Sequence, residues 1–158
     1  MTSHLFPTAG RGARLAVVTC LALFVAVTAS RASLRWATLE AIHQLENPHN
    51  VTRPGPCGEL GAYQFRFATW RMHTKAPFAS ALDRRMSDIV AVSHYEWLKR
   101  GLEQAHLAAS PYNIALAWNG GLDAVIAGKA PGCAHDYASR VVNLVGVFAP
   151  NEPLADAR

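Results

Sequence analysis

The spacing of apolar residues is the feature that most constrains what this chain can fold into. From Ser33 to Glu46, apolar side chains recur three or four residues apart. This period places them on one face of an α-helix. Comparable patterns predict further helices over residues 66–74, 83–104, 111–120, 122–127 and 136–148. The sequence therefore predicts a mainly α, single compact helical domain with minor or no β-structure.

Caps and breakers set the expected limits of these helices. Asn47–Pro48 should end the first one, because proline pushes the preceding residue out of the α region. Ser110–Pro111 is typical of a helix start, with serine as cap and proline at the first helical position. Gly120–Gly121 should end that helix, and Asp136 is the expected cap of the last one.

The segment between the first two helices carries the least regular pattern. Residues 49–58 are rich in Pro, Gly and Asn and are predicted to form a loop. Gly58 to Phe65 is compatible with either a short strand or a tight turn, and both alternatives stay open.

The N-terminal segment is typical of an export signal. Arg11 and Arg14 precede an apolar run from Leu15 to Thr28, and small residues follow. This run of 14 residues is shorter than the roughly 20 that a membrane-spanning helix needs. We therefore predict a signal peptide over residues 1–32, with an uncleaved N-terminal anchor as the alternative. The folded domain is expected over residues 33–149 and a flexible tail over 150–158. The domain would be periplasmic, secreted or membrane-anchored.

The charge balance disfavours a nucleic-acid partner. The formal net charge is +4, but three of the 15 Lys and Arg residues (Arg11, Arg14 and Arg31) belong to the export segment or its edge. The remaining 12 face 11 Asp and Glu residues, so the domain is nearly neutral. A nucleic-acid surface needs a clustered basic patch, which this sequence does not contain.

Two cysteines remain after Cys20, which lies in the export segment, is set aside. Cys57 and Cys133 each lie beside Pro and Gly residues, and export would place them in an oxidising compartment. We expect them to form a disulfide, with two free cysteines as the alternative. No His or Cys spacing supports a metal site.

Glu46 is the carboxylate that the pattern singles out. It lies four residues after Ile42 and seven after Leu39, so a helix would place it with the apolar side chains. Burial raises the pKa of a carboxyl group, as general-acid catalysis near neutral pH requires. Its position just before Asn47–Pro48 also places it beside a loop, where a cleft can open.

Three short segments follow Glu46 in a characteristic order. They are Gly58-Glu59-Leu60-Gly61-Ala62-Tyr63-Gln64, then Ala117-Trp118-Asn119-Gly120-Gly121, then the run from Asp136-Tyr137 to Val141. This ordered set resembles the lytic transglycosylases with the soluble-lytic-transglycosylase (SLT) domain, in the lysozyme-like superfamily. The resemblance covers about Trp36 to Val145 and implies a lysozyme-like α+β fold with a substrate cleft.

The resemblance implies a function and a set of site residues. The protein would cut the glycan strands of peptidoglycan, with Glu46 as the single general acid and base. Gln64 and Asn119 would bind sugar amides and hydroxyls, and Tyr137 would orient Glu46 or the substrate's N-acetyl group. Tyr63 and Trp118 are candidates for stacking on sugar rings. No cofactor or metal is implied, the protein is expected to be monomeric, and a cell-wall-spanning secretion or assembly machine is an optional partner.

The sequence departs from the family pattern at several positions. Asn47 replaces the serine that usually follows the catalytic glutamate, and Ala62-Tyr63 replaces Leu-Met before Gln64. Trp118 replaces a tyrosine, so it loses a hydroxyl but keeps a ring. These departures affect substrate details and leave the acid in place.

Two other functions stay open. Glu59 could be the second carboxylate of a hydrolytic muramidase, and the fold could belong to a non-catalytic cell-wall-binding or assembly protein. The site residues also have structural alternatives: Gln64 and Asn119 could satisfy loop backbone, and Tyr137 could be a core residue of the last helix.

Overall fold

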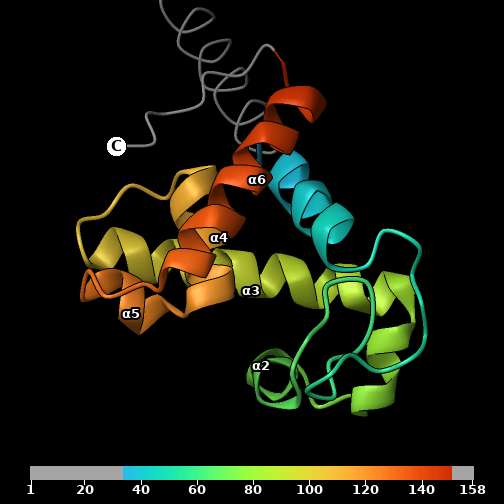
Figure 1. The fold of residues 1–158 in the computed structure, drawn as a ribbon. Coiled ribbons are helices and arrows are strands. Elements are labelled where there is room, and N and C mark those ends of the chain that lie inside the picture. Colours follow the sequence, from blue (N-terminus) through green and yellow to red (C-terminus); the bar gives the residue numbers. More distant parts are fainter. Residues whose placement is uncertain (1–33, 151–158) are drawn as a thin grey trace, which may run out of the picture. The chain divides into compact units, whose positions relative to one another are not determined.

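The computed structural model describes residues 34–150, which form one compact, mainly helical unit. The predictions for residues 1–32 and for the tail beyond Pro150 lie outside the described residues. Helices account for most of the structure, and the described part of the chain contains no strand, only an isolated antiparallel bridge between Leu60 and Phe65. The elements follow in chain order (Figure 1): a helix over residues 34–46, α2 (Phe67–His73), the 3-10 helix η1 (Phe78–Leu82), α3 (Arg84–Gln104), α4 (Pro111–Gly120), α5 (Leu122–Ile126) and α6 (Gly132–Phe148). The prediction of a mainly α domain is confirmed.

Most of the predicted helix limits are also confirmed. The first helix ends at Glu46, directly before Asn47–Pro48. The side chain of Asp83 accepts a hydrogen bond from the backbone N–H of Met86 at the start of α3, and Ser110 accepts one from Asn113 at the start of α4. Gly121 follows the end of α4 with a φ of +88°, a conformation that glycine adopts without strain.

Two details of the helix prediction are wrong. The last helix begins at Gly132, with Pro131 as its N-cap, so Asp136 lies inside α6. The early start brings Ala134, which is fully buried, against the backbone of Gly120 at the end of α4. The 3-10 helix η1 was not predicted, because its five residues are too few to show a helical period.

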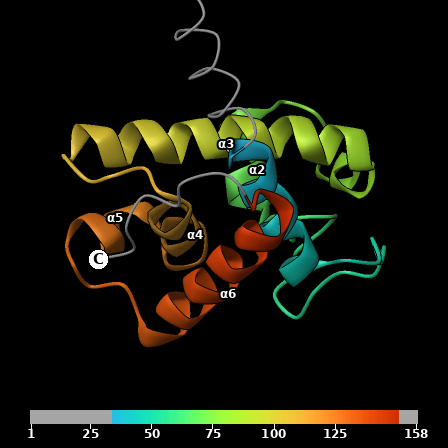
Figure 2. The same ribbon diagram turned by 90° about the horizontal axis from the view of Figure 1, so that it is seen from above.

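Helix α3 is the long central element, and α4 lies against both α3 and α6 (Figure 2). The buried face of α3 includes Val90, Leu98 and Leu102. It does not include Ile89, which is 53% exposed. The largest fully buried apolar side chains come from the first helix, α2, α3, α4 and α6: Trp70, Ile42, Leu98, Leu102, Ile114, Val90, Val141 and Val145.

Residues 47–66 form an irregular segment, and hydrogen bonds from the side chain of Asn47 fix its backbone at two points. The amide of Asn47 is 6% exposed. Its Nδ2 donates to the carbonyl oxygens of Val51 (2.9 Å) and Gly61 (3.1 Å), and its Oδ1 accepts from the N–H of Val51 (2.8 Å). Residues 61–64 form a tight turn between the bridged Leu60 and Phe65, so the turn alternative is correct for this segment.

Gly61 is the position in this turn that only glycine can occupy. Its φ is +81°, and a Cβ atom there would overlap the carbonyl of Ala81 at the end of η1. Gly58 has nearly the same φ, +80°, but no atom lies near the position of its missing Cβ. At Gly61 the backbone of the turn therefore packs directly against the backbone of η1.

We expect Gly61→Ala to lower the free energy of unfolding by about 3 kcal/mol or more, from backbone strain together with displacement of η1. Gly58→Ala is the matched control, because it carries the strain without the overlap and should cost only about 1–2 kcal/mol. Urea unfolding of both variants measures the difference. Equal losses would show that the contact with Ala81 does not constrain the fold.

Candidate functional site

Glu46 is the last residue of its helix, and its side chain is half-buried. The hydroxyl of Tyr137, on α6, donates a hydrogen bond of 2.8 Å to Glu46 Oε1. This contact joins two helices that lie side by side in Figures 1 and 2, although the residues are 91 positions apart in sequence. The structure thus brings two of the sequence-predicted site residues into direct contact.

The surroundings of Glu46 favour its protonated form. Burial raises its pKa, as the sequence predicted; the hydrogen bond from Tyr137 partly offsets this, and the negative charge of Glu59 adds to it. Burial and the neighbouring Glu46 carboxylate also raise the pKa of Tyr137, so that phenol remains a hydrogen-bond donor. Glu46 is therefore placed to hold a proton above the pH at which an exposed glutamate loses it.

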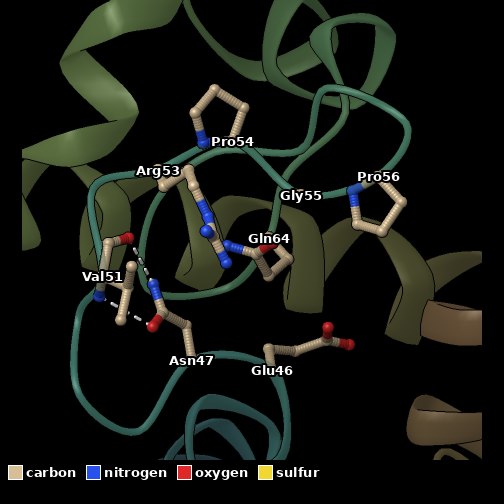
Figure 3. A pocket seen from close by; sticks show the side chains of 8 residues that line it. All are labelled: Glu46, Asn47, Val51, Arg53, Pro54, Gly55, Pro56 and Gln64. Carbon is tan, nitrogen blue, oxygen red and sulfur yellow. Dashed lines mark hydrogen bonds between the residues drawn. The ribbon is translucent and has the colours of Figure 1, made fainter.

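Two hollows meet at Glu46. The larger one, about 580 Å³, lies toward the end of α4, and the smaller, about 450 Å³, lies under the loop that follows Asn47 (Figure 3). Glu46, Pro56 and Gln64 line both of them. We refer to the two hollows together as the groove; apart from these shared residues, a different set of side chains lines each of them.

Glu59 also lines the larger hollow, but its pKa is shifted in the opposite direction to that of Glu46. Hydrogen bonds from the backbone N–H groups of Glu59 and Cys57 lower its pKa, and Arg66 lies 3.4 Å from its Oε1. The pKa of Glu59 is therefore lowered, while that of Glu46 is raised. Two carboxyl groups with pKa values shifted in opposite directions are typical of acid–base sites.

Gln64 lines both hollows. It has a φ of +46°, and its Nε2 donates to the carbonyl oxygen of Gly61 (3.0 Å), so it supports the turn as well as lining the groove. Gly55 packs so closely that a Cβ there would lie 2.7 Å from Gln64 Oε1 and from Glu59 Oε2. Both the structural and the substrate-facing alternatives for Gln64 thus have a geometric basis.

Trp118 and Asn119, at the end of α4, line the larger hollow. Asn119 is exposed, whereas Trp118 is half-buried, with ring centroids 6.0 Å from Tyr63 and 5.8 Å from Phe65. Tyr63 is only 4% exposed, and its hydroxyl donates to Asp88 (2.8 Å). Its ring therefore packs against the ring of Trp118 and leaves little surface exposed for contact with a sugar.

Several residues at the groove were not identified from the sequence. His94 lines the larger hollow, packs edge-on to Trp118, and has its Nδ1 2.9 Å from Nε2 of His73. Burial, with the charge of His73, lowers the pKa of His94 to about 3, so it is neutral. Arg53 lines the smaller hollow. Neither lies in a sequence pattern: His94 reaches the groove because α3 packs against distant segments, and Arg53 reaches it from an irregular loop.

Trp36, in the first helix, is exposed although it is a large aromatic residue. It is 58% exposed, with its ring edge-on to Phe148 at a centroid distance of 6.2 Å. Its neighbour Ala37 faces inward instead.

The predicted disulfide is wrong. Cys57 and Cys133 are both free and both exposed. Cys133 lies in the first turn of α6 rather than in a loop, so the helix fixes the direction of its side chain. Cys57 lies in a turn whose backbone is bonded to Glu59. No group of three His, Cys, Asp or Glu side chains within residues 34–150 could hold a metal ion.

The raised pKa of Glu46 predicts a pH-dependent effect of Glu46→Gln on stability. A carboxyl group whose pKa is higher folded than unfolded stabilises the fold below the unfolded value, 4.5, and loses that contribution as the pH rises through the folded value. Glu46→Gln should therefore raise the free energy of unfolding at pH 7 and bring no such gain below about pH 4. Urea unfolding across this range, beside the exposed Glu103→Gln, measures it. A pH-independent difference would contradict the burial of the charge.

Within the described part of the chain, no helix is both long enough and apolar enough to cross a membrane. Comparison of the chain with protein-family models, with curated proteins and with solved structures finds no match. The function is therefore argued from the site itself.

Proposed function

We propose that this protein is a lytic transglycosylase that cuts the β-1,4 bond between N-acetylmuramic acid and N-acetylglucosamine in peptidoglycan. The observation that carries the proposal is the state of Glu46: half-buried, raised in pKa, hydrogen-bonded by Tyr137 and lining a groove on both of its sides. The ordered motifs around Glu46 and the mainly helical fold support the same reading.

In this proposal Glu46 acts first as an acid and then as a base. Its proton passes to the glycosidic oxygen as the bond from the muramic C1 breaks, which leaves an oxocarbenium-like centre assisted by the substrate's own N-acetyl group. The Glu46 carboxylate then takes the proton of the 6-hydroxyl while that oxygen bonds to C1. A 1,6-anhydro ring closes, no water is consumed, and Glu46 regains its proton.

The neighbouring residues have distinct roles in this mechanism. Tyr137 occupies Oε1 of Glu46, so Oε2 is the oxygen left free to exchange the proton. Trp118 offers an apolar ring in the larger hollow, and Asn119 and Gln64 offer amides to the sugar. Tyr63 acts indirectly, by supporting the ring of Trp118.

A hydrolytic muramidase is the second candidate, favoured by Glu59. This carboxylate lines the same hollow as Glu46 and stays ionised, which is what a base that activates water requires. In the transglycosylase proposal Glu59 is not needed for chemistry, because it is already bonded to backbone N–H groups and lies beside Arg66.

Digestion of purified peptidoglycan with wild type, Glu46→Gln and Glu59→Gln tests these alternatives. We expect wild type to release anhydro-ended fragments, lighter by one water than reducing ends, and Glu46→Gln to be about 100- to 10,000-fold slower. Glu103→Gln, on the exposed side of α3, is the control.

Other product patterns have defined meanings. Reducing ends whose release requires Glu59 would establish the hydrolase instead. Full activity of folded Glu46→Gln would contradict either enzyme, and sedimentation with peptidoglycan without any release by wild type would establish a binding protein.

Tyr137→Phe should lower kcat/KM about tenfold and move the alkaline limb of the pH–rate profile to higher pH. The bond from Tyr137 lowers the pKa of Glu46, so its loss lets Glu46 hold its proton further into the alkaline range. Tyr112→Phe is the matched control, because the Tyr112 hydroxyl bonds to His135 away from Glu46. A profile that keeps its shape in Tyr137→Phe would show that the hydroxyl does not act on Glu46.

A further inference from the structure

The smaller hollow differs from the larger one in the charge that it presents. Its ionisable lining residues are Glu46, whose protonated form is favoured, and Arg53. Arg53 is exposed and forms no ion pair or side-chain hydrogen bond with any residue in the range 34–150. Figure 3 shows its side chain directed from the loop toward the interior of the hollow. This half of the groove therefore offers a free cation beside the acid.

The larger hollow presents the opposite charge. Its lining cation, Arg66, lies 3.4 Å from Glu59, which stays ionised and is hydrogen-bonded by backbone N–H. The positive charge on that side is thus already engaged. A glycan whose carboxylates are carried by every second sugar would meet a neutralised or negative surface there and an unpaired guanidinium in the smaller hollow.

The backbone that carries Arg53 is held on both sides. Two residues before it, Val51 is bonded through both its N–H and its carbonyl to the side chain of Asn47. Directly after it, Pro54 restricts Arg53 to an extended backbone, and the N–H of Gly55 donates to the carbonyl of Glu59 (2.9 Å). The base of the arginine is therefore fixed before any ligand binds, which reduces the entropy lost on binding.

We propose that Arg53 binds a carboxylate of the substrate and so sets which of the two alternating β-1,4 bonds reaches Glu46. The two sugars of peptidoglycan differ in the lactyl ether that only the muramic unit carries. The lactyl group supplies a carboxylate where no peptide is attached; where a stem peptide is joined to it through an amide bond, the peptide supplies the carboxylates. A planar guanidinium pairs with a carboxylate through two parallel hydrogen bonds. When the carboxylate of a muramic unit is bound on one side of Glu46, one of the two alternating β-1,4 bonds lies at the Glu46 carboxyl group and the other does not. This proposal rests on the proposed function and names the group that the same site recognises.

The test compares Arg53→Gln with Arg85→Gln, an exposed arginine on α3 that lines neither hollow. The substrates are peptide-bearing glycan, peptide-free glycan with free lactyl carboxylates, and neutral N-acetylglucosamine oligomers. We expect Arg53→Gln to lower the ratio of kcat/KM for acidic over neutral substrate about tenfold and to release ends from both kinds of bond. Arg85→Gln should change neither measure.

The two acidic substrates separate the sources of the carboxylate. A loss confined to peptide-bearing glycan identifies the stem peptide, and a loss on peptide-free glycan identifies the lactyl group. An unchanged ratio and unchanged bond choice in Arg53→Gln, or an equal loss on the neutral oligomers, would overturn the proposal.

A binding measurement separates this proposal from the proposed function. Peptide-free muramyl oligosaccharide is titrated calorimetrically into Glu46→Gln and into Glu46→Gln with Arg53→Gln. We expect about tenfold weaker binding in the double variant, and binding by the single variant that weakens with salt. Arg53-dependent binding without cleavage by wild type would contradict the enzyme and keep the anion site. Binding that is absent, or independent of Arg53, would reject the anion site whatever the activity.

Discussion

The buried amide of Asn47 is the interaction on which the rest of the site depends. It follows Glu46 directly. Its side chain bonds both to Val51, which lines the smaller hollow, and to Gly61, which begins the turn that carries Gln64. A buried amide that makes all of these bonds fixes its partners, because breaking any of them would leave a polar group without water or protein. The residue that directly follows the Glu46 helix thereby fixes the position of the loop at Val51 and of the turn at Gly61.

The charges around Glu46 follow from how each side chain is held. Glu46 is covered by packing and receives one hydroxyl, so its pKa rises; Glu59 receives backbone N–H groups, so its pKa falls. Bonds to its neighbours Val51 and Gly55 hold the backbone of Arg53, and its guanidinium has no ion-pair partner among residues 34–150. Three ionisable groups in one groove thus have three different roles available: proton exchange, fixed negative charge and anion binding. Because these three groups differ in charge and in bonding, the groove is a candidate functional site.

Local signals in the sequence were enough for most of the secondary structure. The helix that ends at Glu46, the caps at Asp83 and Ser110 and the glycine end of α4 all depend on residues within one turn of each other. The start of α6 was misplaced because it depends on Ala134 packing against Gly120, a contact between two helices. The disulfide was wrong for a similar reason: the sequence does not show where the side chains of Cys57 and Cys133 point, and Cys133 lies in α6 rather than in a loop.

The sequence by itself determined that this protein is mainly helical and that Glu46 lies on the apolar side of a helix end, because both follow from a period of 3.6 residues and a proline. Only the tertiary structure decided which groups reach Glu46. Tyr137 arrives from 91 residues away, Glu59 and Arg53 come from an irregular loop, and Tyr63 turns out to support Trp118 from below. Such contacts depend on the packing of segments far apart in the chain, which no local pattern encodes.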